Sequence, residues 1–358
     1  MVSAPGVPSS AGLLMLGPMR QIVIAALWLL THLSTSASML NEIATGPWPL
    51  GLERAIRIPE VNTLTEAKVT LGRRLFFDKT LSRNGELSCA TCHDPARGFS
   101  NGLPLAKGVS NEDGDRNVPP VFNRVLGTAQ FWDGRAPDLE TQALGPLFSA
   151  KEMGMDEALV IKRISGDSHY RDLFQRAFNA PPSLTNLAKA LACFQRTLVS
   201  GSTPFDQYEW GGLSDALSVE AKRGLQHFRG KARCSTCHIG TNFTDEKFHN
   251  LGAGGADGMK DPGLMRVTGD LRDFGRFRTP TLRNVSLTGP YMHDGSIPSL
   301  KEIVLFYNKG GRNNSNLDKE IKPLGLTEQE VEDLVSFLNS LTGPIISVPV
   351  SDLADDSP

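Results

Sequence analysis

Apolar residues recur at helical intervals along most of this 358-residue chain. In one segment near the C-terminus, the apolar residues of a single helix face are Val331, Leu334, Val335, Leu338 and Leu341. Ser or Thr precedes Glu by three positions at 63–66, 299–302 and 327–330, and this capping-box spacing predicts helix N-termini there. Gly-, Asn- and Pro-rich stretches at 101–120 and 250–263 predict long loops. The pattern therefore predicts a mostly α fold with long ordered loops.

Two C-x-x-C-H motifs carry the candidate chemistry, and their residues are Cys89, Cys92, His93, Cys234, Cys237 and His238. In this motif one haem can alkylate both thiols, and the histidine can then bind the iron. A single motif could equally be a zinc half-site or a redox pair. Two copies without another cysteine pair predict two covalently bound c-type haems. We expect the fifth cysteine, Cys193, to be a small buried helix residue.

The surroundings of the two motifs are also alike. Residues 71–93 and 221–238 each contain an amphipathic helical segment that ends in phenylalanine, followed by a short basic or Gly-containing loop and the motif. This looks like an internal duplication. We therefore predict two cytochrome c-like domains with one haem each, at 38–205 and 206–345, followed by a tail at 346–358.

The far face of each iron depends on which residues can reach it. Residues 94–168 contain no histidine, and their methionines are Met153 and Met155, so we expect the first iron to have an open face. The candidates for the second iron are His249, Met259, Met265, Met292, His293 and Tyr307. Spacing does not choose among them, and each histidine could equally be a hydrogen-bonding core or loop residue. Tyr307 shares a predicted helix face with Leu300 and Val304 and should point inward, as a ligand or as a buried core tyrosine.

Composition excludes some classes of function. The 37 basic residues nearly balance the 39 acidic ones, giving a formal net charge of −2. Such a balance provides no basic field for nucleic acid and no polybasic membrane patch.

The N-terminus resembles an export signal. Arg20 precedes the apolar run 22–30, and small and polar residues follow as far as Ala37. This order predicts a secretory signal peptide at 1–37, with a retained N-terminal anchor as the alternative. Because c-type haem is attached outside the cytoplasmic membrane, we expect a periplasmic protein without stable membrane insertion after cleavage.

Three stretches carry a resemblance to a known family. They are RNVPPVFNRVLGTAQFWDGRAPDLETQALGP with KEMG (116–154), CSTCH (234–238) and TPTLRNVSLTGPYMHDGSIPSLKEIVLFY (279–307). Their order and spacing resemble the bacterial di-haem cytochrome c peroxidase/MauG superfamily over nearly the whole mature chain. The ligand pattern is most similar to the MauG/MbnH-type branch.

The resemblance implies roles for several residues. Glu152 would be the acid/base near the open face of the first haem, Gln142 and Pro146 would line the same pocket, and Trp132 would lie between the haems. Asn117, with the carbonyls of Thr288 and Pro290, would bind Ca²⁺. Two of these residues also have purely structural interpretations. Ser149 and Glu152 have capping-box spacing, and Trp132 could be a packed aromatic residue.

The resemblance also implies a function. Many of the peroxidases close the first iron with a loop histidine, which 102–120 lacks, and they usually have methionine where this chain has Tyr307. Both departures favour a periplasmic oxidoreductase that uses H₂O₂ to form a high-valent haem pair and oxidises a partner protein, for example at tryptophan. The alternatives are a peroxidase supplied with electrons by a small cytochrome or cupredoxin, and a passive di-haem electron carrier. Ala232 stands where MauG has a tryptophan that relays charge to its substrate, so the exit route stays open.

Overall fold

The computed structural model describes residues 48–53, 58–254 and 260–347. The predicted signal peptide at 1–37 and most of the predicted tail lie outside these residues. Within the described ranges, no helix has the length and apolar character needed to cross a membrane.

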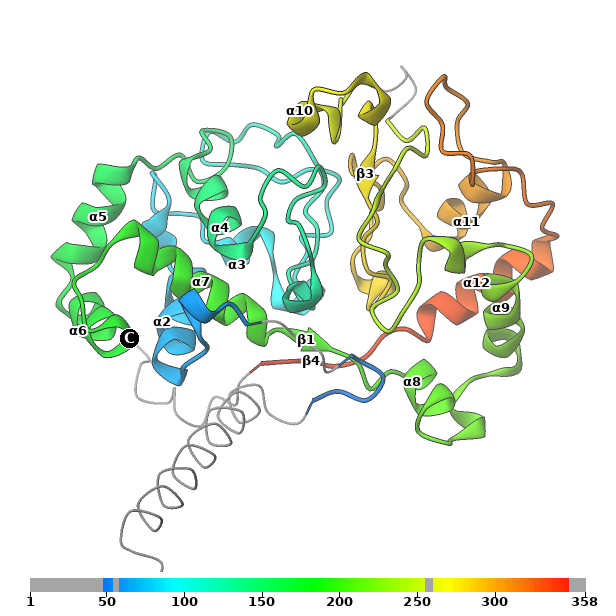
Figure 1. The fold of residues 1–358 in the computed structure, drawn as a ribbon, viewed down its shortest axis with the longest axis horizontal. Helices are drawn as coiled ribbons and strands as arrows, with labels where there is room; N and C mark the ends of the chain where they lie inside the picture. Colours follow the sequence, from blue (N-terminus) through cyan, green and yellow to red (C-terminus); the bar gives the residue numbers. More distant parts are fainter. Residues whose placement is uncertain (1–47, 54–57, 255–259, 348–358) are drawn as a thin grey trace, which may run out of the picture. The chain divides into compact units, whose positions relative to one another are not determined.

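The prediction of a mostly α fold is confirmed (Figure 1). The helices are α2 (Glu66–Phe77), α3 (Cys89–Cys92), α4 (Leu139–Phe148), α5 (Glu157–Gly166), α6 (Ser168–Phe178), α7 (Leu184–Thr197), α8 (Pro204–Glu209), α9 (Val219–Arg229), α10 (Met265–Thr268), α11 (Leu300–Asn308) and α12 (Glu328–Asn339). Two short antiparallel pairs join β1 (Val199–Ser200) to β4 (Ile345–Ile346) and β2 (Phe248–His249) to β3 (Phe277–Arg278). Long loops of irregular structure connect these elements.

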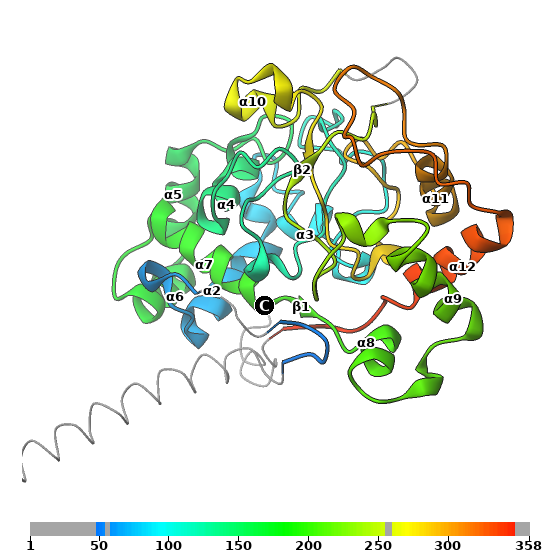
Figure 2. The ribbon, with the colours of Figure 1, turned by 45° about the vertical axis from the view of Figure 1, so that its right-hand side comes forward.

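The same helix pairing occurs in both halves of the chain. Helix α2 packs against α7, and α9 packs against α12, as both views show (Figures 1 and 2). A glycine lies at each closest approach. A Cβ atom at Gly72 would overlap the carbonyl oxygen of Ala190, and one at Gly224 would overlap that of Asp333. Each pair therefore depends on a backbone contact that only glycine permits.

The segments between the helix pairs are also equivalent. Isolated bridges join Gln130 to Ala136 and Tyr291 to Ile297, and α4 and α11 follow these bridges at the same distance. An N-cap side chain begins each of the two helices. When the two halves are aligned on these bridges and helix starts, Pro146 in the first half corresponds to Tyr307 in the second.

Local helix signals were partly correct. Ser299 and Thr327 cap α11 and α12 as predicted, but α2 begins two residues later than its sequence signal, because Thr65 accepts the hydrogen bond from the Lys68 N–H.

The capping interpretation of Glu152 was wrong. Ser149 ends α4, and its carbonyl accepts hydrogen bonds from the N–H groups of Glu152 and Gly154. This tight turn, with Gly154 at φ 63°, keeps residues 149–154 out of a helix. The next helix, α5, is capped by Asp156.

Buried charges tie distant segments together. Arg283 and Asp206 are both fully buried and form a salt bridge of 2.8 Å, and Arg283 also donates to the carbonyls of Thr241 and Gly51. A buried pair of this kind is costly to break from one side. The described residues belong to one compact unit, so the predicted boundary at 205/206 would divide that unit and stays a prediction.

Replacing either interface glycine should destabilise the protein. We expect Gly72→Ala and Gly224→Ala each to lower the free energy of unfolding by about 1–3 kcal/mol, because the added methyl group must push the paired helices apart. Gly166→Ala is a matched control, since its Cβ meets open space at the end of α5. This control should change stability by less than about 0.5 kcal/mol. Denaturant unfolding measures all three, and equal stability in the three variants would contradict the packing argument.

Candidate cofactor-binding cavities

Each C-x-x-C-H motif lines its own cavity. The first cavity is lined by Cys89, Cys92, His93, Gln142, Pro146, Glu152 and Met153, among others. The second is lined by Cys234, Cys237, His238, Tyr291, Met292, His293 and Tyr307, among others. Asn117, Trp132 and Arg278 line both. The structure therefore brings the predicted residues together in two groups that share one wall.

The two motif histidines are held in the same way. Nδ1 of His93 lies 3.1 Å from the carbonyl oxygen of Phe99, and Nδ1 of His238 lies 2.9 Å from that of Phe243. Both phenylalanines have positive φ, 57° and 52°, which turns these carbonyls toward the rings. Burial lowers the pKa of both histidines, that of His93 to about 4. A neutral imidazole that donates from Nδ1 keeps its Nε2 lone pair for a metal.

The residues present fit a haem in each cavity. The motif cysteines are free thiols, and each pair lies on a single helical turn, α3 or the 3₁₀ turn Cys234–Thr236. In the first cavity, the buried Oε1 of Gln142 has no hydrogen-bonding partner within the described part of the chain. In the second cavity, the Tyr307 hydroxyl forms no hydrogen bond with the described residues. Polar atoms in such places normally have a partner, which a bound group would supply.

The far wall of the first cavity carries a carboxyl group and no second histidine. Glu152 is half-buried, and desolvation raises its pKa, opposed by Arg135 and by a hydrogen bond from Ser149. Its carbonyl accepts from the Val109 N–H, which anchors the turn. Pro146, at the position equivalent to Tyr307, offers no ligand atom in its ring. The cavity thus keeps one face free of strong iron ligands, although the Met153 side chain lines it.

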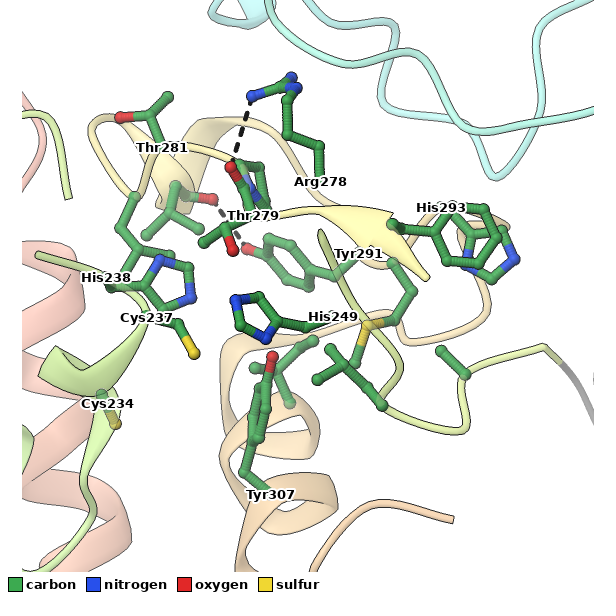
Figure 3. A pocket seen from close by; sticks show the side chains of 18 of the residues that line it. Cys234, Cys237, His238, His249, Arg278, Thr279, Thr281, Tyr291, His293 and Tyr307 are labelled. Atoms are coloured by element: carbon green, nitrogen blue, oxygen red, sulfur yellow. Dashed lines mark hydrogen bonds between the residues drawn. The ribbon is translucent and has the colours of Figure 1, made fainter. Parts of the chain in front are cut away.

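Tyr307 faces the second cavity. Figure 3 shows its side chain extending from α11 with the hydroxyl directed toward the His249 ring, in the cavity that Cys237 and His238 also line. Desolvation raises the pKa of this phenol, and the two motif cysteines raise it further. Since this hydroxyl forms no hydrogen bond within the described residues, its environment fits a metal ligand better than that of a satisfied core tyrosine. By contrast, the Tyr291 hydroxyl in the same cavity donates to the carbonyl of Val285 at 3.0 Å.

The other candidates for the second iron are less suitable. Both ring nitrogens of His249 are engaged, Nδ1 with Asp318 at 2.6 Å and Nε2 with Asp245 at 3.0 Å. His293 stacks on Phe277 at 3.6 Å between ring centroids. Met292 lines the cavity, Met265 is absent from its lining, and Met259 lies outside the described residues.

One cluster could also bind a metal ion. Potential ligand atoms of Cys237, Asp245 and His249 lie within 4.8 Å of one another. The Cys237 sulfur cannot both form a thioether bond to haem and bind a metal ion as a thiolate. A metal ion in this cluster is therefore an alternative to haem attachment at the second motif.

Trp132 is fixed between the two cavities. Its Nε1 donates to the carbonyl of Asn117 at 2.8 Å, and its own carbonyl accepts from the Arg278 N–H at 2.8 Å. Asn117 Nδ2 donates to the carbonyls of Leu103 and Pro104, which leaves the side-chain oxygen available. Asn117 lines the second cavity together with Thr288 and Pro290, its predicted partners in a Ca²⁺ site, and that site stays a prediction.

Sequence reasoning missed the buried charges beside Trp132. Glu246 lies between Arg124 at 3.0 Å and Arg278 at 2.9 Å, and Arg116 pairs with Asp133 and Asp261, both at 2.7 Å. Burial lowers the pKa of Arg278 to about 9, and the charge of Arg124 contributes. These residues are far apart in the chain and follow no motif, so no local signal could have identified them.

Comparisons with known proteins agree with this geometry. Residues 66–213 match the family described as di-haem cytochrome c peroxidase, and residues 221–342 match cytochrome c. Methylamine utilization protein MauG of Methylorubrum extorquens is 45% identical over 79% of this chain and 80% of its own. Cytochrome c551 peroxidase of Pseudomonas aeruginosa is 37% identical over 80% and 82%.

A solved structure has a similar fold. The crystal structure of a MauG-like protein associated with microbial copper homeostasis superposes with a TM-score of 0.76 and 34% identity, covering 83% of this chain and 96% of that one. These matches support two haems, but the relatives include both MauG proteins and peroxidases.

Removing one cysteine pair should remove one haem. We expect the double variant Cys89→Ala with Cys92→Ala to retain a single covalent haem, because the second motif attaches its own. Cys193→Ala is the control, since Cys193 is buried in α7 and contacts the side-chain oxygen of Asn62. Mass spectrometry after acid–acetone extraction counts the haems. Two haems in the double variant, or one in the control, would refute the assignment.

Proposed function

The chain belongs to the di-haem cytochrome c peroxidase/MauG family, and from this premise we propose that it is a MauG-type enzyme that uses H₂O₂ to oxidise a partner protein in the periplasm. Peroxide-dependent oxidoreductase activity with two haems follows from the family. The observation that carries the finer proposal is Tyr307, whose hydroxyl enters the second cavity without a protein partner among the described residues.

The cofactors would be held by the motif residues. Cys89 and Cys92 would form the thioethers in the first cavity and Cys234 and Cys237 those in the second, with His93 and His238 as the iron ligands. When bound, the haems supply the reaction with peroxide at the first iron and the storage of oxidising equivalents over both.

Glu152 would move the proton that peroxide cleavage requires. A carboxyl group in this cavity could take a proton from one oxygen of H₂O₂ and return it to the other oxygen, which then leaves as water. The raised pKa of Glu152 suits this exchange, because a carboxyl group whose pKa is shifted toward neutral pH accepts a proton more readily. Gln142 Oε1, which lacks a partner among the described residues, could accept the remaining peroxide O–H, and the Pro146 ring in the same lining would offer no atom that binds iron.

Tyr307 would set the properties of the second haem. A phenolate is an anionic ligand and favours higher oxidation states, whereas a methionine thioether favours the ferrous state and electron delivery. Trp132, which lines both cavities, would connect the two haems electronically. A Ca²⁺ ion held by Asn117, Thr288 and Pro290 would keep the wall around Trp132 in place.

A cytochrome-fed peroxidase is the second candidate function. The match to cytochrome c551 peroxidase supports it, and so does Ala232, which is 5% exposed and puts a methyl group where MauG has its relay tryptophan. A direct comparison separates the two functions. The same preparation is supplied with H₂O₂ and either a reduced small cytochrome or a candidate partner protein. Faster turnover with the cytochrome would favour the peroxidase, and no turnover with either would favour a passive carrier.

Glu152→Gln should retain both haems and react with H₂O₂ roughly 10²–10⁴-fold more slowly, because the amide cannot accept and return the proton. Stopped-flow absorbance after mixing with peroxide measures this rate. Glu157→Gln, on the exposed side of the neighbouring helix α5, is the control and should react at the wild-type rate. An unchanged rate in Glu152→Gln would exclude it as the proton carrier.

Tyr307→Phe should change the spectrum of the second haem and raise its reduction potential, because an anionic ligand is lost. Tyr291→Phe also removes a hydroxyl from this cavity, but that hydroxyl is hydrogen-bonded to the Val285 carbonyl. This variant should therefore leave the spectrum and potential of the second haem near those of the wild type. Spectroelectrochemical titration of both variants is the measurement. If the two behave alike, Tyr307 is not the ligand, and the MauG-type proposal loses its main support.

A further inference from the structure

One hydrogen bond followed by two aromatic contacts connects the second cavity with the protein surface. The His238 ring is hydrogen-bonded to the Phe243 carbonyl, and the Phe243 ring lies 5.2 Å from that of Phe205 between centroids. Phe205 in turn lies 5.4 Å from Trp210, edge to face at 86°. Phe205 is 2% exposed, whereas Trp210 is 46% exposed. The series therefore begins at the predicted iron ligand and ends at an indole in contact with solvent.

We propose that Trp210 is the surface residue through which electrons from the partner protein reach the second haem. The inference rests on the proposed function, which leaves the exit route open because Ala232 cannot carry charge. Indole loses an electron far more readily than a phenyl ring does, and Trp210 is the outermost ring of the series.

The first half of the chain provides an internal comparison. Phe76 contacts the His93 ring and also Phe99 and Phe194, and in the second half Phe228 contacts Phe243 and Phe337 in the same pattern. The outward ring in the first half is Phe77, which contacts Phe76 and is 42% exposed. A phenyl ring at the surface cannot readily be oxidised. The duplicated packing thus leads to an oxidisable surface residue only on the side of the second haem, as far as the described residues show.

The environment of the series favours oxidation at its outer end. The Arg283 guanidinium lies 5.7 Å from the Phe243 ring, and that of Arg229 lies 6.0 Å from the Phe205 ring. A cation beside a ring makes removal of an electron from that ring harder. The two phenyl rings would therefore shorten the gaps that an electron must cross, without being oxidised themselves.

Trp210 is also well placed for a partner. The backbone N–H of Trp210 donates to the Asp206 carbonyl at the end of α8, and Gly51 packs against the indole so closely that a Cβ there would lie 2.7 Å from Cζ3. Residues 211–215, which follow, are all exposed. The ring is thus held on one side and open on the other.

The electron balance is simple. One electron leaves the Trp210 indole and reaches the haem pair, which H₂O₂ has oxidised, and one electron from the partner then restores Trp210. Any proton lost from the indole N–H goes to solvent and returns on reduction. Two such transfers account for the two electrons that reduce one H₂O₂ to water.

The route can be tested without peroxide. In the di-haem protein, Leu213→Cys places a thiol on the exposed segment near Trp210, and a ruthenium photo-oxidant attached there reacts selectively because Cys193 is buried. With the second haem chemically reduced, a laser flash starts electron transfer to the label, and the haem absorbance gives the rate. We expect Trp210→Phe to lower this rate by roughly tenfold or more. Tyr208→Phe, a half-buried neighbour, should leave it unchanged.

Equal rates with and without Trp210 would overturn the proposal, and so would a larger effect of Tyr208→Phe. Peroxide provides an independent readout. In the absence of a partner, H₂O₂ should oxygenate Trp210 before other surface residues, as peptide mass spectrometry detects, and Trp210→Phe should slow partner oxidation while the initial haem response to H₂O₂ stays unchanged. If peroxide gives no haem response but the flash-induced rate depends on Trp210, the proposed function fails and the electron route stands.

Discussion

The hydrogen bonds of Asn117 hold together the wall that both cavities share. Its N–H donates to the carbonyl of His293, its carbonyl accepts from Trp132, and its Nδ2 bonds two loop carbonyls. One residue thereby fixes the loop 101–120 of the first half against the second half and sets the position of the indole between the cavities. Charge transfer between two cofactors depends steeply on distance, so a rigid wall here matters more than rigidity elsewhere.

Charged side chains surround this wall, and burying them costs free energy. The need to hold the wall in one arrangement accounts for their presence. Arg124 and Arg278 are buried and Arg116 is largely so, and each is paired with acidic side chains from elsewhere in the chain. Such networks seldom stabilise a fold more than apolar packing would, but they specify one arrangement, because any displacement leaves a buried charge unpaired. The carbonyl of Trp132 is bonded to the backbone of Arg278, so the network and the indole are positioned together.

The two halves show how one packing scheme can carry different chemistry. The paired helices, the glycines at their contacts and the histidine-to-phenylalanine hydrogen bonds are repeated. The differences fall at cavity and surface positions. Pro146 stands opposite Tyr307 and Trp132 opposite His293, whereas the exposed rings Phe77 and Trp210 do not occupy equivalent positions. Each exchange alters what a cofactor or partner would meet and leaves the helix packing unchanged.

The sequence by itself determined the class of the protein. The two C-x-x-C-H motifs, the helical periodicity and the stretches that resemble the family are local patterns, which can be read without knowing the tertiary contacts. It also placed Tyr307 on an inward helix face, because helix geometry acts over a few residues. It could not show that Ser149 and Glu152 form a turn, since the competing backbone hydrogen bonds depend on how α4 ends. Nor could it show that both ring nitrogens of His249 are hydrogen-bonded, to Asp245 and Asp318. It also could not show that Trp210 contacts Phe205, which in turn contacts Phe243. Those facts depend on contacts between segments far apart in the chain, and only the tertiary structure decided them.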